Sequence, residues 1–169
     1  MTAVAGGHFF GLRSTKQFLK PLVKPRPTNF YNSYAEMNTT SILKKLQSEP
    51  LHRNFSIDRG SVKDGSRTVD LAFATNRPIQ HWFGKLKLSM NSKAMRNERL
   101  KSGAALLVDH DWKDVVGVVE KHSIGADGVA RATVRFGESV RATEIFQDVQ
   151  TGIRQNVSVG FLIHSLKKE

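Results

Sequence analysis

The sequence contains no cysteine among its 169 residues. This absence excludes a disulfide framework, a thiolate nucleophile and a zinc site with cysteine ligands. The chain also lacks an apolar run of the length that spans a membrane, about 20 consecutive residues. Its first residues, Met1 to Gly11, are small and apolar but follow no charged region, so they do not predict a signal peptide. The sequence therefore predicts a protein without membrane contact or sulfur-based chemistry.

Acidic residues are also scarce. The chain has 26 Lys and Arg against 15 Asp and Glu, a net charge of +11. Residues 1–55 carry eight basic and two acidic side chains, a net +6, whereas residues 56–169 carry 18 and 13, a net +5. A basic segment of this kind can contact nucleic acid, an acidic scaffold or an acidic shell lining, or it can be a solvated tail.

The first 52 residues are predicted to form a basic, largely disordered extension. Three prolines within residues 20–27 each remove an amide donor and restrict the preceding residue, which argues against regular structure. A short helix is still predicted from about residue 39 to residue 47, because hydroxyl side chains can cap its start and Ile42 and Leu46 share one side.

Residues 53–169 are predicted to form one mostly antiparallel β domain with few helices. An amphipathic helix is expected at residues 139–150, because apolar residues recur with helical spacing from Ala142 to Val149 and Gly152 can cap the end. A shorter helix is expected at residues 92–100. Strands are expected at residues 53–58, 67–75, 104–109, 115–122 and 128–136, and around Val157 to Ile163.

Two short segments carry residues suited to hydrolytic chemistry. His110 ends an apolar run and is flanked by Asp109 and Asp111, and Ser158 lies in the middle of the last strand. A serine needs a neighbouring base to become a nucleophile, and imidazole titrates near neutral pH. The residues alone favour the non-catalytic interpretation, with His110 a loop histidine between two aspartates and Ser158 a strand serine that faces solvent or bonds a neighbour.

The order and setting of several segments resemble the prohead proteases of tailed phages and prophages. In that family a histidine in an LL-x-x-H-D stretch and a serine in S-[VI]-G-[FY] form the catalytic pair. The resemblance runs from about residue 53 to the end of the chain. The segments that show this resemblance are RTVDLAFA at residues 67–74, QHWFG at 80–84, LLVDHDW at 106–112, VVGVVE at 115–120, ARATVRF at 130–136 and NVSVGF at 156–161.

The resemblance implies a β-barrel with flanking helices, similar to the herpesvirus assembly proteases, and a serine endopeptidase with His110 as base and Ser158 as nucleophile. It implies scaffold and major capsid protein as substrates, action inside the procapsid in the bacterial cytoplasm, self-association as a homodimer, and no cofactor. The alternative is a non-catalytic capsid or scaffold component that keeps the fold and uses its basic arm to contact the shell or DNA.

The third catalytic group is not placed by the sequence. Asp109 and Asp111 adjoin His110, but sequence neighbours point in different directions. His164 is on the same face as Ser158 but about 20 Å along the strand. The family takes this group from a strand downstream of the serine, so the chain is expected to lack the family's C-terminal strands, and the oxyanion hole is likewise unassigned. The remaining histidines are spread without ligand spacing, so no metal site is predicted.

Overall fold

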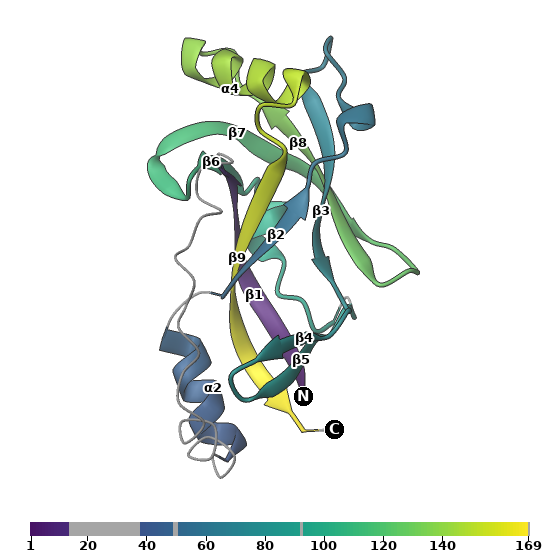
Figure 1. Cartoon of the computed structure of the whole chain (residues 1–169), viewed down its shortest axis with the longest axis vertical. Helices are drawn as coiled ribbons and strands as arrows, with labels where there is room; N and C mark the ends of the chain where they lie inside the picture. Colours follow the sequence, from purple (N-terminus) through teal and green to yellow (C-terminus); the bar gives the residue numbers. More distant parts are fainter. Residues whose placement is uncertain (14–37, 49–50, 92, 169) are drawn as a thin grey trace.

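The computed structural model describes residues 1–13, 38–48, 51–91 and 93–168, and its main feature is one large β-sheet (Figure 1). Nine strands take part, in the order β2-β9-β1-β6-β7-β8-β3, with β5 pairing β1 and β4 pairing β5. Their bounds are β1 Thr2–Arg13, β2 Leu51–Ser56, β3 Thr68–Thr75, β4 Ile79–His81, β5 Gly84–Leu88, β6 Ala105–Val108, β7 Asp111–Ile124, β8 Val129–Phe136 and β9 Asn156–Lys167. The helices are α2 Thr39–Ser48, α3 Glu98–Lys101 and α4 Val140–Thr151, with a short 3-10 turn at Arg59–Ser61.

The sheet curls until its two outer strands meet. A single bridge between Ile57 and Leu71 joins the end of β2 to β3. Further along the same seam, the Arg53 side chain reaches from β2 and donates from Nη1 to the Thr75 carbonyl at 3.1 Å. Burial lowers the pKa of this guanidinium below its ordinary value. The nearly closed barrel with few helices confirms the mainly β prediction.

The inner face of the barrel holds the core. Along β9, Val157, Val159 and Ile163 are fully buried in the hydrophobic core, and Ser158 between them is buried as well. Phe73 of β3 is also fully buried. Burying a side chain of this size contributes about 1.5–3 kcal/mol, so these positions account for much of the sheet's stability.

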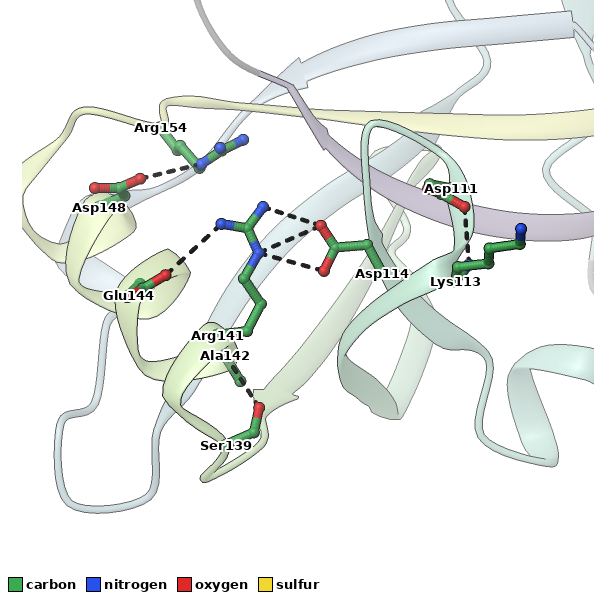
Figure 2. Close-up of polar contacts among 9 residues, drawn as sticks. All are labelled: Asp111, Lys113, Asp114, Ser139, Arg141, Ala142, Glu144, Asp148 and Arg154. Carbon is green, nitrogen blue, oxygen red and sulfur yellow. Dashed lines mark hydrogen bonds and ion pairs between the residues drawn. The ribbon is translucent and has the colours of Figure 1, made fainter.

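Helix α4 covers one end of the barrel, at the top of Figure 1. Its buried face carries Ala142, Ile145, Phe146 and Val149. Ser139 caps the start by accepting from the Ala142 amide at 3.2 Å, and Gly152 ends the helix in the left-handed conformation. Figure 2 shows the outer face, where Arg141 pairs with Asp114 of β7 at 3.0 Å. The predicted helix and its cap are confirmed.

The predicted extension needs a correction. Residues 2–13 form β1 in the middle of the sheet, antiparallel to β9 and parallel to β6. The predicted helix at 39–47 is confirmed as α2, but it is part of the folded domain, because its Ile42 and Leu46 are buried. The prediction from composition was wrong here, because strand pairing with residues at least 85 positions away leaves no local signal. The expectation of disorder for residues 14–37 falls outside the described residues.

Within the described ranges, no helix has the length and apolarity needed to cross a membrane. The short helix expected at residues 92–100 is reduced to the single turn of α3, Glu98–Lys101. The hairpin expected between β7 and β8 is present, and its turn is closed by the Gly128 amide donating to the Gly125 carbonyl at 3.0 Å. Thr2 of β1 and Lys167 of β9 are register partners, so both termini lie at one end of the molecule (Figure 1).

Candidate active site

His110 occupies a two-residue turn between β6 and β7. Val108 and Asp111 are register partners, so Asp109 and His110 form the hairpin loop between them. Both loop residues have positive φ, 48° at Asp109 and 63° at His110. Positive φ at both positions is the type I′ geometry that matches the twist of a hairpin. The turn is tied to β1 by the Asp109 amide, which donates to the Leu12 carbonyl at 3.1 Å.

This backbone geometry is unusual for a histidine. The second position of such a turn favours glycine, because a side chain at positive φ is strained. Nothing in the sequence requires a bulky residue to form the hairpin, since a glycine would form it better. Histidine at this position therefore lowers the stability of the turn. What it provides in return is the position of its imidazole.

The imidazole of His110 lies against Gly11 of β1. A Cβ built on Gly11 would lie 2.9 Å from three ring atoms of His110. Real side chains essentially never approach so closely, so the ring occupies space that any other residue at position 11 would need. The missing side chain of Gly11 allows His110 to reach across β1 toward the next strand.

That next strand carries Ser158. Gly11 and Ser158 are register partners in the antiparallel pairing of β1 with β9. Directly opposite residues share a face, with Cβ positions about 4.5–5.5 Å apart. The His110 ring, which lies over the Cβ position of Gly11, is therefore on the same face as Ser158 and a short distance from it. The structure brings the two predicted residues together.

The two residues are not on adjacent strands, because β1 lies between the histidine hairpin and β9. Gly11 compensates, because the ring crosses above it. The Ser158 side chain is fully buried, and its hydroxyl has no hydrogen-bond partner among the described residues.

No hydrogen bond or ion pair among the described residues joins the side chains weighed as a third group to the ring. The Asp111 carboxylate accepts from the Lys113 amide at 2.9 Å (Figure 2). Asp109 is exposed. His164 lies six positions beyond Ser158 on β9, near the far end of the strand.

The structure instead places His52 of β2 beside His110. The two ring centroids are 4.7 Å apart, with an angle of 64° between the ring planes. Sequence reasoning missed this neighbour. The alternation of β2 places His52 and Asn54 on one face, but only the register with β9 shows that the face is that of Ser158.

Two further histidines have shifted pKa values. Burial lowers the pKa of His81 and of His122, and the positive charge of Lys101 adds to the effect at His122. In the described part of the chain, no group of three or more histidine or acidic side chains is arranged to hold a metal ion. The site is thus built from one serine, two histidines and the glycine between them.

No family model matches the chain, and no solved structure matches it. One curated protein is similar: a major capsid protein of Halomonas phage phiHAP-1, 46% identical over 88 residues. The match covers 50% of this chain but only 15% of the capsid protein, so the chain corresponds to a small part of its relative. Over half of its length, the chain is therefore related to a phage major capsid protein.

Proposed function

We propose that this chain is a serine endopeptidase of phage head maturation, with Ser158 as nucleophile and His110 as general base. The observation that carries the proposal is the position of the His110 imidazole. A strained hairpin turn holds the ring over Gly11, on the face of Ser158 and across from it. Strained backbone at a functional side chain is a recurring property of active sites.

The chemistry follows from these two groups. The Ser158 oxygen attacks a peptide carbonyl while His110 takes the hydroxyl proton. The tetrahedral intermediate collapses, His110 returns the proton to the departing amine, and the peptide C–N bond breaks. A water molecule then attacks the ester, with His110 again acting first as base and then as acid. Ser158 lies on the rigid β9 strand, whose inner face is packed in the core, and this rigidity favours a fixed attack geometry.

The buried state of Ser158 has a kinetic consequence. Its side chain is fully inaccessible. A peptide or a reagent must therefore reach it through a local opening of the residues that cover it, and the population of the open form limits the rate. Modification of Ser158 is expected to be slower than modification of an exposed active-site serine.

The proposed substrates are the scaffold and the N-terminal arm of the capsid protein, cut inside the procapsid in the host cytoplasm. The relation to a phage major capsid protein supports a role in the head. The net charge of +11 favours acidic partners such as a scaffold or a shell lining, and permits weak contact with nucleic acid. Association as a homodimer belongs to the same proposal.

A second function is favoured by the name of the relative. A chain that matches part of a major capsid protein can be a non-catalytic component of the head that keeps the fold. In that case the basic residues contact the shell or DNA, and Ser158 and His110 are packing residues. Binding to DNA through such residues would weaken steeply with added salt.

Replacing Ser158 by alanine separates the two functions. The chain is co-expressed with the capsid protein and scaffold of its phage, and the masses of both are measured. Ser158→Ala is expected to abolish processing while changing stability by about 1 kcal/mol or less, because it removes one hydroxyl that makes no hydrogen bond among the described residues.

Ser165→Ala is the matched control, because Ser165 is an exposed serine on the same strand. This variant is expected to process both proteins as the wild type does. Labelling by a fluorophosphonate, located by peptide mass mapping, should modify Ser158 and no other serine. Undiminished processing by Ser158→Ala would show that the protease assignment is wrong and favour the head component.

A further inference from the structure

One end of the molecule is rich in lysine and is built from elements without acidic residues. It is the end at the bottom of Figure 1, where α2, β4, β5, the start of β1 and the end of β9 lie. The sequences of these five elements contain no aspartate or glutamate. Glu49 and Glu169, which follow α2 and β9 in the sequence, are outside the described residues. The exposed lysines of this lysine-rich end are Lys44, Lys45, Lys85, Lys87, Lys167 and Lys168.

Three of these lysines lie side by side on the sheet. Thr2 of β1 is the register partner of both Lys87 on β5 and Lys167 on β9, so the backbones of the two lysines are about 10 Å apart. Lys85 is two residues from Lys87 and shares its exposed face, whereas Leu86 between them is buried. Among the described residues, none of these three lysines takes part in an ion pair.

Several arginines on other elements are, by contrast, paired with carboxylates. Figure 2 shows Arg141 with Asp114 and Arg154 with Asp148, at 3.0 Å and 3.2 Å. Arg131 of β8 is likewise paired with an aspartate of the β7–β8 turn, at 2.6 Å. The positive charge of the lysine-rich end is not offset in this way, so it is available to attract an anionic partner.

A surface hollow of about 440 Å³ adjoins Lys87. Its volume is within the range of sites that bind small groups. Backbone from the turn between β7 and β8 forms one side of it. Hydroxyl and amide groups, which can donate hydrogen bonds to a carboxylate, line the rest of it with the Lys87 ammonium. The side chains that carry them are Thr2, Asn76, Ser89 and Asn91.

We propose that the lysine-rich end is a docking surface for an acidic segment of a polypeptide substrate, with one carboxylate in the hollow beside Lys87. The assignment of the docked polypeptide as substrate rests on the proposed protease function, whereas the binding itself does not. In an extended peptide, side chains on one face recur about every 7 Å, which matches the separation of Lys85 and Lys87 along β5. Acidic residues at alternate positions of the peptide therefore meet both lysines.

The composition of this end favours a polypeptide over a nucleic acid. Single-stranded nucleic acids are bound by stacking their bases on open aromatic rings. Here the Trp82 ring is covered by the Lys45 ammonium at 4.7 Å and packs edge-on against Phe83 at 4.9 Å. The cations of α2 and β5 are all lysines, without the planar fork by which arginine grips a phosphate.

Strand β9 connects the docking surface to the proposed active site. Lys167 is nine residues from Ser158, a distance of about 30 Å along an extended strand. A substrate held at the lysine-rich end has its cleavage segment close to Ser158 at a raised effective concentration. The lysines touch no reacting atom, so their loss should raise KM and leave kcat unchanged.

The experiment measures, by fluorescence anisotropy at low salt, the affinity of the full chain for a labelled peptide of alternating glutamate and serine. The combined variant Lys85→Gln, Lys87→Gln and Lys167→Gln is expected to bind about tenfold more weakly. The matched control is Lys63→Gln, Lys101→Gln and Lys121→Gln, which removes the same charge from exposed lysines of other segments and should bind as the wild type does. Circular dichroism checks that both variants are folded.

A neutral substitution tests the hollow apart from the charge. Ser89→Phe fills the hollow and is expected to weaken peptide binding severalfold, whereas Ser123→Phe, at an exposed position of β7, should not. For a protein substrate with an acidic segment about nine residues from its cleavage site, the variant at positions 85, 87 and 167 should raise KM about tenfold. Labelling of Ser158 by a fluorophosphonate should be unchanged, because so small a reagent does not use the docking surface.

Equal affinity of the two triple variants for the peptide would overturn the proposal. A thymidine oligonucleotide that binds the wild type more tightly than the peptide, and loses its affinity in the variant at positions 85, 87 and 167, would overturn it in favour of a nucleic-acid surface. An unchanged KM would show that the docked polypeptide is not the substrate. If the wild type does not label at Ser158, the protease function fails, and the peptide measurement still decides whether the docking surface exists.

Discussion

At the scale of the residue, the site depends on Gly11, because this position has no side chain. Gly11 is partner to Ser158 in the sheet, and the His110 ring fills the place where its Cβ would be. Extended strands accept alanine readily, so the backbone at this position does not itself require glycine. The requirement comes from the ring that crosses it.

Replacing Gly11 by alanine therefore tests the geometry of the site. The new methyl group would displace the His110 ring, because three ring atoms lie 2.9 Å from its position. Processing of the capsid arm is expected to fall by about 100-fold, since small displacements of catalytic groups carry large penalties. Urea denaturation should show a loss of about 1–3 kcal/mol from overpacking, which leaves the protein folded.

Gly65→Ala provides the control, because a Cβ at Gly65 meets no atom within 4 Å and its φ is not in the left-handed region. It should process normally. Wild-type processing by a folded Gly11→Ala protein would mean that the ring position seen here is not the one used in catalysis.

The residue scale also shows what sequence can reveal. His110 and Ser158 were identifiable because their neighbours, DHD and SVGF, resemble a known motif. Gly11 and His52 were not, since each matters only through a partner distant in the sequence. Gly11 meets a ring 99 positions away, and His52 meets one 58 positions away. Neither relation has a local signature, so neither could be predicted from the sequence.

At the scale of the element, the β6–β7 hairpin contains a histidine that lowers the stability of its turn. Its loop residues Asp109 and His110 both have positive φ. Asparagine or aspartate followed by glycine is the favoured pair for such a turn. Position 109 follows this preference and position 110 departs from it.

His110→Gly and His110→Ala form a matched pair that measures the strain. Both variants lose the imidazole and its contacts, but only glycine relieves the positive φ. The glycine variant is expected to be more stable than the alanine variant by about 1–2 kcal/mol in urea denaturation. Neither should process the capsid arm.

Equal stability of the two variants would show that the turn relaxes when the ring is removed. The control pair is Lys113→Gly and Lys113→Ala, in the strand just after the turn, where φ is negative. There the order should reverse, because glycine weakens a strand interior.

Elements with a local pattern were predictable. The helical spacing of α4, the glycine that caps it and the alternation of β9 each lie within a dozen residues. β1 was missed because its sequence contains two adjacent glycines and no clear alternation. Its neighbours β6 and β9 determine its structure, and tertiary pairing outweighs intrinsic preference in strands.

At the scale of the whole molecule, β1 joins the two halves of the site. It pairs with β9 over nearly its whole length and with β6 at Phe10 to Leu12. Without it, the strand that leads to His110 and the strand that carries Ser158 share no neighbour in the sheet.

Deletion of residues 1–13 is accordingly expected to abolish processing and to unfold most of the domain, whose total stability should be about 5–15 kcal/mol. Circular dichroism and processing are measured on residues 14–169, alone and with the synthetic peptide of residues 1–13. The peptide should restore part of both signals, and a scrambled peptide neither. A deletion variant that stays folded and active would show that β1 is dispensable.

The position of β1 also imposes an order in time. Residues 1–13 are translated well before their longest partner, Asn156–Lys167. During synthesis, the edge of β1 that pairs with β9 stays unpaired while more than a hundred residues are added. Pairings between such distant segments form slowly. His110 and Ser158 therefore cannot be placed on one face before β9 has been translated and paired with β1. The proposed chemistry is accordingly absent from the nascent chain until that point of synthesis.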